Sequence, residues 1–129
     1  MTDTPSRPPV FVSTDEYDRL YSLAYAAQDR EPGADTLIEE LARARVTPAA
    51  DTPQDVVRMH DHVTFSYDGT LYKGFQLVYP HEADISARRI SVLTHVGAML
   101  LGLGAGETIA WQGGDSRRHT LDVEAVART

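Results

Sequence analysis

The chain has 129 residues, of which 42% are hydrophobic and 24% are charged, and its formal net charge at pH 7 is −7. This is the composition of an ordinary globular domain. The acidic excess argues against direct binding of DNA or RNA, because nucleic-acid affinity depends mainly on lysine and arginine contacts to phosphates. The absence of cysteine excludes disulfides, zinc–thiolate sites and cysteine nucleophiles, and it favours a reducing cytoplasm.

The first nine residues, Met1 to Pro9, are polar and rich in proline. They lack the apolar segment of an export signal, and no membrane-spanning run of about eighteen apolar residues occurs in the sequence. We therefore expect residues 1–9 to be a flexible N-terminus and the protein to be cytoplasmic.

A helical hairpin is expected in residues 10–47. Its first helix should follow a short extended run and continue to about Gln28, because apolar residues recur at intervals of three and four. Ser13 and Glu16 have the spacing of a capping box, which predicts where this helix begins.

The second helix should follow the helix-breaking pair at residues 32–33. Thr36 and Glu39 repeat the capping-box spacing, and Arg43 and Arg45 would occupy the last turn, where positive charge favours the helix dipole. A connection this short predicts antiparallel packing, and we expect the pair to form a short coiled coil. At 1.5 Å per residue, the two helices would be about 22 Å and about 17 Å long.

Residues 48–54 contain two prolines and no periodicity, so we expect a linker there and a second domain at residues 55–129. Asp68–Gly69 separates two runs of β-branched and aromatic residues, which predicts a β-hairpin. The expected strands lie at Val56–Val57, Val63–Tyr67, Thr70–Tyr79, Ile90–Val92, Thr108–Trp111 and Thr120–Val126, with a turn at Gly113–Gly114 before the last.

One helix is expected within this second domain, at Val96–Leu103. Gly97 and Gly102 would weaken it in isolation, so it must pack on the sheet. A helical hairpin followed by an antiparallel sheet that carries one helix is an α+β fold.

No pattern in the sequence indicates an active site, a metal site or a cofactor. His60-Asp61-His62 would place its two histidines on one face of a strand without a third ligand, so we interpret them as surface residues. The glycines from Gly102 to Gly106 end a helix instead of opening one, which is the wrong arrangement for a phosphate loop. A G-x-S-x-G nucleophile elbow is also missing.

The run from Arg89 to Trp111 reads as strand, turn, helix, glycine turn and strand. It resembles the C-terminal domain of the Gre transcript-cleavage factors. The order of hairpin and sheet resembles the Rnk-like family of regulators of nucleoside diphosphate kinase, and this resemblance covers the chain from Pro9 onward. It implies that the sheet domain is FKBP-like and that the partner is RNA polymerase.

The resemblance also implies a docking site. In Gre factors, the stretch between this strand and helix docks on the rim helices of the largest polymerase subunit, at the entrance of the secondary channel. Leu93, Thr94, His95 and Val96 match that stretch. His95 stands where relatives commonly have proline, which implies an altered contact, and Thr94 is also a candidate N-cap.

Three acidic residues, Asp29, Glu31 and Asp35, surround the expected tip of the hairpin. Gre factors have carboxylates at a coiled-coil tip that help to hold a catalytic Mg²⁺ in the polymerase. Helices of about 20 Å are too short for that reach. We therefore expect a non-enzymatic regulator that competes with Gre-type factors at the channel entrance and does not cleave transcripts.

Two other functions remain open from the sequence. The sheet domain could be an FKBP-like peptidyl-prolyl isomerase, because that fold supports the activity in other families. Alternatively, the chain could be a protein-interaction adaptor with a client other than RNA polymerase.

Overall fold

The computed structural model describes residues 10–112 and 117–128, so the expected flexible N-terminus and the Gly113–Gly114 turn lie outside the described residues. The helices are α1 (Thr14–Ala26), α2 (Ala34–Arg43) and α3 (His95–Leu100), and 3-10 turns occur at Ala49–Asp51, Pro80–Glu82 and Ile85–Ala87. The strands are β1 (Phe11–Ser13), β2 (Arg45–Thr47), β3 (His62–Tyr67), β4 (Thr70–Val78), β5 (Arg89–Ser91), β6 (Thr108–Gln112) and β7 (Arg118–Ala127). None of the helices in this part of the chain could cross a membrane.

The main sheet has five strands in the order β5-β4-β3-β7-β6. Neighbouring strands are antiparallel except for β5, which runs parallel to β4. The predicted turn at Asp68–Gly69 is confirmed: the two residues have φ angles of 50° and 86°, a backbone region that aspartate tolerates and glycine favours. Val56, in contrast, forms only an isolated bridge with Gly104, so the predicted strand at Val56–Val57 is wrong.

Helix α3 packs on the sheet, as its two glycines indicated, but it ends at Leu100 and not at Leu103. Gly102 is the reason. Its φ angle is +81°, and a Cβ at this position would lie 2.3 Å from Val10 Cγ1. The helix therefore ends where the chain must turn sharply to let the N-terminal strand pass.

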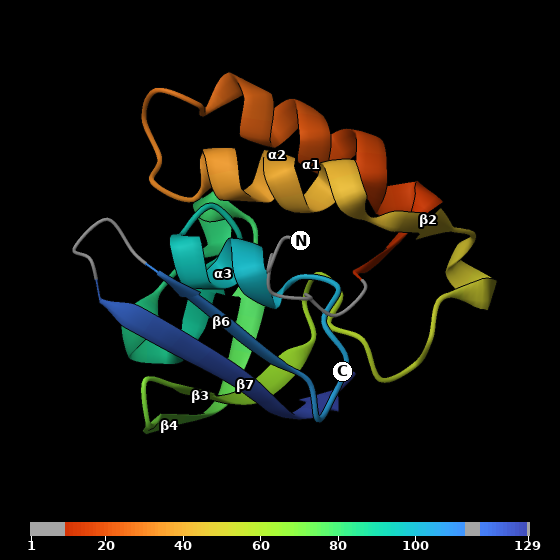
Figure 1. Ribbon diagram of the computed structural model, residues 1–129. Helices are drawn as coiled ribbons and strands as arrows, with labels where there is room; N and C mark the ends of the chain where they lie inside the picture. The colour runs from red at the N-terminus through yellow and green to blue at the C-terminus, as the bar shows by residue number, and fades with distance from the viewer. Residues whose placement is uncertain (1–9, 113–116, 129) are drawn as a thin grey trace, which may run out of the picture.

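Helices α1 and α2 lie side by side and antiparallel across the side of the molecule that carries α3 (Figure 1). Leu20 and Ala24 of α1 and Leu37 and Leu41 of α2 are buried in the same hydrophobic cluster as the sheet residues. The hairpin therefore rests on the sheet domain and does not project from it as an arm.

Neither of the two predicted capping boxes forms. Ser13 is the N-cap of α1, but its side chain makes no capping hydrogen bond, and Glu16 packs near Met59, where burial raises the pKa of its carboxyl group. Helix α2 begins at Ala34, earlier than predicted, and Thr36 Oγ1 hydrogen-bonds His95 Nδ1 at 3.0 Å. In both cases a side chain that the local pattern assigned to a capping box interacts instead with a residue distant in sequence: Glu16 with Met59, and Thr36 with His95.

Arg45 was also misassigned, because it begins β2 instead of ending α2. Strand β2 pairs in parallel with β1, with Phe11 opposite Arg45 and Ser13 opposite Thr47. The two strands join the start of α1 to the end of α2, so they close the open end of the hairpin.

The turn between α1 and α2 is held against the loop before α3 by direct backbone contact. Gly33 N donates a hydrogen bond to Leu93 O at 2.8 Å. A Cβ on Gly33 would lie 2.3 Å from Thr94 O and 2.4 Å from Leu93 O, so no side chain fits between the two segments.

The end of β7 is held by an arginine. Arg128 donates to Gln54 O and Val56 O, and its Nη2 lies 3.4 Å from the buried carboxylate of Asp61. Burial is the main cause of the raised pKa of Asp61, and the charge of Arg128 opposes that shift.

Replacing Gly33 with alanine should destabilise the fold by about 1–3 kcal/mol, because the added methyl group collides with two backbone carbonyls that can move only with the loop. Chemical denaturation measures the loss. Asp29→Ala, an exposed change in the same turn, is the control and should alter the free energy of unfolding by less than about 0.5 kcal/mol. Equal stability of Gly33→Ala and wild type would contradict the contact.

Arg128→Ala should lower the free energy of unfolding by about 1–3 kcal/mol, because two carbonyls lose a donor and Asp61 loses its cation. The deficit should shrink as pH falls through the raised folded-state pKa of Asp61, since a neutral carboxyl group needs no cation. Denaturation at several pH values checks both effects. Lys73→Ala, which removes an exposed cation, should show neither.

Candidate functional site

The expected docking stretch, Leu93–Val96, forms the turn before α3 and the first residues of the helix. Leu93 is buried, whereas His95 and Val96 are half-buried at the surface. Thr94 is the N-cap of α3, as predicted: its Oγ1 accepts from Gly97 N at 3.0 Å and donates to Ser91 O at 2.7 Å. The backbone of this stretch is therefore fixed before any partner arrives.

The acidic residues of the expected tip lie beside this stretch. Asp29 and Glu31 are exposed in the turn, and Asp35 is exposed in the first turn of α2, where it accepts a hydrogen bond from Gln28. Because Gly33 is bonded to Leu93, the structure brings the two sets of predicted site residues together at one end of the molecule.

An aromatic cluster, which the sequence did not indicate, completes this end of the molecule. The Trp111 ring lies 5.4 Å from the ring of His95, 6.1 Å from Tyr67 and 5.7 Å from His119, measured between centroids. The pairing of β6 with β7 places Trp111 directly opposite His119. The sequence patterns of β6 and β7 predict two strands that contain Trp111 and His119. Only the register of the two strands shows that these residues lie opposite each other.

His119 is itself held in place by an acidic residue. Its Nδ1 lies 2.6 Å from Asp68 Oδ2, and the Thr120 amide donates to Asp68 Oδ1 at 2.8 Å. These hydrogen bonds, that of His119 first, lower the pKa of Asp68. The turn between β3 and β4 is thereby tied to the aromatic cluster.

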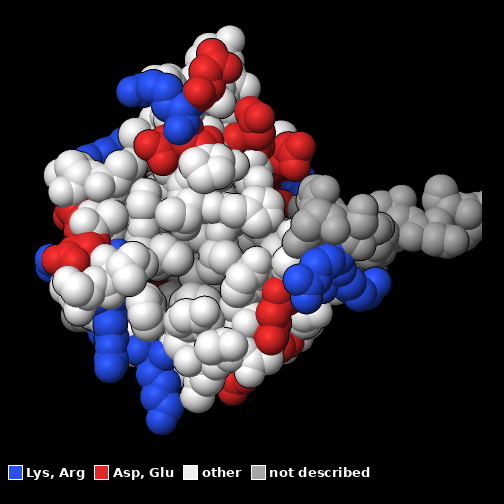
Figure 2. Space-filling model, turned by 90° about the vertical axis from the view of Figure 1, so that its left-hand side faces the viewer, with Lys and Arg blue, Asp and Glu red and all other residues white. Residues whose placement is uncertain are grey.

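We call this end of the molecule the turn face and define it by the α1–α2 turn (residues 27–33), residues 93–96, Tyr67, Trp111 and His119. Figure 2 looks onto the side that is on the left in Figure 1, where the turn and the start of α3 lie. Its centre is filled by uncharged side chains, and charged side chains lie around the edges. A surface that is uncharged at its centre and charged at its rim is typical of protein–protein contact sites.

The histidines at residues 60–62 do not form a metal site. His60 precedes β3 with a φ angle of 72°, and its Nε2 lies 2.8 Å from Glu82 Oε1, which lowers the pKa of Glu82. Asp61 is buried, not at the surface, and accepts from Arg58 N at 2.8 Å. Within residues 10–112 and 117–128, no three histidine or acidic side chains are grouped to hold a metal ion.

Two family models and several known proteins match the sequence of this chain. The family model described as transcription elongation factor GreA/GreB, C-terminal part, matches residues 52–128, and the model described as Rnk N-terminus matches residues 8–46. The regulator of nucleoside diphosphate kinase of Escherichia coli strain K12 is 37% identical over 113 residues, which cover 83% of this chain and 80% of that protein.

Two further relatives are elongation factors. The transcription elongation factor GreA of Rhodospirillum rubrum is 33% identical over 90 residues, which are 66% of this chain and 57% of that protein. The solved structure of the prokaryotic transcription elongation factor GreA/GreB from Nitrosomonas europaea superposes with a TM-score of 0.71 at 32% identity, covering 94% of this chain and 99% of that one. These matches confirm the resemblance found in the sequence, and the chain belongs to the Rnk-like family of regulators of nucleoside diphosphate kinase, with a GreA/GreB-type C-terminal region.

Proposed function

We propose that this protein is a non-enzymatic transcription regulator that binds RNA polymerase at the entrance of the secondary channel and competes there with longer Gre-type factors. The observation that carries the proposal is the bond from Gly33 N to Leu93 O, which joins the family's docking stretch and the acidic turn in one surface. Membership of the family supports RNA polymerase as the partner.

The contact is proposed to centre on Leu93–Val96, with the rim helices of the largest polymerase subunit as its target. The capped start of α3 gives this stretch a fixed shape, which lowers the entropy cost of binding. Asp29 and Glu31 lie at the edge of the same face, where they would attract a basic partner and speed its approach.

Transcript cleavage is not part of the proposal, because the acidic turn does not extend far enough from the molecule to enter the channel. Helices α1 and α2 have 13 and 10 residues. At 1.5 Å per residue they are about 20 Å and about 15 Å long, and they rest on the sheet domain. The carboxylates of the acidic turn, held beside the docking stretch, would stay at the channel entrance. The protein would therefore act by occupying that entrance.

The proposal keeps four expectations from the sequence. They are a hairpin unit at residues 10–47 with a linker at 48–54, an FKBP-like architecture for residues 55–129, action in the cytoplasm, and no cofactor. The antiparallel strands that carry α3 agree with the second expectation, although the hydrophobic core continues across the linker.

Reversing the charge of the turn with Asp29→Lys and Glu31→Lys should weaken binding to purified core RNA polymerase by about tenfold, because both carboxylates would meet a basic partner. Fluorescence titration with labelled protein at low and high salt measures the effect, which salt should reduce. The matched control, Asp18→Lys with Glu39→Lys, makes the same change in net charge at exposed helical positions outside the turn face and should bind like wild type.

Thr94 tests the docking stretch itself. Thr94→Arg should prevent binding, because a long side chain would stand at the centre of the contact, whereas Thr94→Ser keeps the hydroxyl that caps α3 and should bind normally. Thermal unfolding of both variants shows how much of the effect is lost stability.

Three results would contradict the proposed function. The first is the absence of binding to core polymerase at micromolar concentrations. The second is stimulated cleavage of backtracked transcripts. The third is acceleration of peptide proline isomerisation above the uncatalysed rate, which would favour the isomerase alternative.

A further inference from the structure

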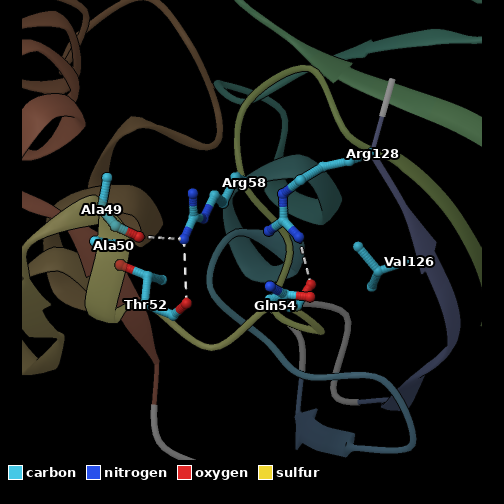
Figure 3. Close-up of a pocket in the computed structure, with 7 residues that line it drawn as sticks. All are labelled: Ala49, Ala50, Thr52, Gln54, Arg58, Val126 and Arg128. Atoms are coloured by element: carbon cyan, nitrogen blue, oxygen red, sulfur yellow. Dashed lines mark hydrogen bonds between the residues drawn. The ribbon is translucent and has the colours of Figure 1, made fainter.

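The connection after β2 passes the end of β7 on the opposite side of the molecule from the α1–α2 turn (Figure 1). Residues of both segments line a pocket. Its volume is about 510 Å³, which is within the range of small-molecule sites. Figure 3 shows the residues that line it, which are Ala49, Ala50, Thr52, Gln54, Arg58, Val126 and Arg128.

Arg58 lines this pocket, and two backbone carbonyls fix its guanidinium group. Its Nη2 donates to Ala49 O at 2.9 Å and to Thr52 O at 3.2 Å, which uses both hydrogens of that nitrogen. Its Nε is buried and has no hydrogen-bond partner among the described residues. The Nη1 nitrogen carries two more N–H groups. The guanidinium group is therefore held in position while some of its hydrogen-bond donors make no bond to the part of the protein that the structure describes.

Arg128 also lines the pocket, and backbone carbonyl groups hold its guanidinium group in place as well. It donates to Gln54 O and Val56 O, and these contacts leave further N–H groups on the guanidinium. Figure 3 shows the guanidinium group of Arg58 next to Ala49 and Thr52, and that of Arg128 next to Gln54.

The charged side chains that line the pocket are all positive, although the protein is acidic overall. The seven lining residues include two arginines and no carboxylate. Asp61, 3.4 Å from Arg128 Nη2, offsets one of the two charges. The charge of Arg58 interacts with the carboxylates of Glu16 and Asp61, neither of which lines the pocket. The pocket wall itself therefore presents two guanidinium groups beside the small apolar surfaces of Ala49, Ala50 and Val126.

We propose that this pocket binds a small molecule through a phosphate or another tetrahedral oxyanion group, held between Arg58 and Arg128. A tetrahedral oxyanion offers several acceptor oxygens in different directions, which suits two guanidinium groups that reach it from separate elements. The apolar wall would contact the organic part of the ligand. This site is separate from the turn face and does not depend on the proposed function.

Titration of the full-length protein with inorganic phosphate and with phenyl phosphate, followed by ¹H–¹⁵N NMR at constant ionic strength, tests the proposal. Saturable shifts confined to amides of residues 49–58 and 126–128 are expected for at least one of the two. Tighter binding of phenyl phosphate identifies an organic phosphate as the ligand class, and equal binding identifies the free anion.

Ala50→Glu keeps both arginines and all their carbonyl contacts but places a carboxylate in the pocket, so it should weaken phosphate binding by about tenfold or more. Ala83→Glu makes the same charge change at an exposed residue outside this pocket and should bind like wild type. Shifts that do not saturate, that spread over other arginines, or that persist in Ala50→Glu would overturn the proposal.

Discussion

The close backbone approach at Gly33 is the constraint on which the arrangement of this molecule depends. Two main chains meet there with no side chain between them, and the bond from Gly33 N to Leu93 O fixes their separation. Because the turn is held in this way, α2 lies over α3, and Thr36 reaches His95. The acidic turn and the start of α3 consequently form one continuous surface.

Local signals in the sequence were sufficient for the elements that depend on local chemistry. The helical hairpin, the Asp68–Gly69 turn and the N-cap at Thr94 were all predicted, because each is set by neighbouring residues. The errors arose where a partner distant in the sequence decides the structure. Strand β2 exists because it pairs with β1, and Thr36 leaves its capping role because His95 is close.

The same distinction applies to the candidate site. Leu93 to Val96 could be nominated because the sequence resembles a known family, and the structure adds what surrounds them. The cluster of Trp111 with His119 follows from the register of β6 and β7, which strand composition does not determine. The arginine pocket could not be predicted either, since its two cations are separated by most of the second domain's length.

The two ends of the described chain converge on one segment. Phe11 N donates to Gly102 O, Gly102 N donates to Val57 O, and Arg128 reaches Val56 O. Each contact joins residues that are far apart in sequence, so forming it requires closing a long loop at an entropy cost. Folding rates fall as such distant pairings come to dominate a structure. The junction around Val56 should thus assemble last, after the hairpin and the β3–β4 ribbon, and a nascent chain could not complete it before β7 and Arg128 had been synthesised.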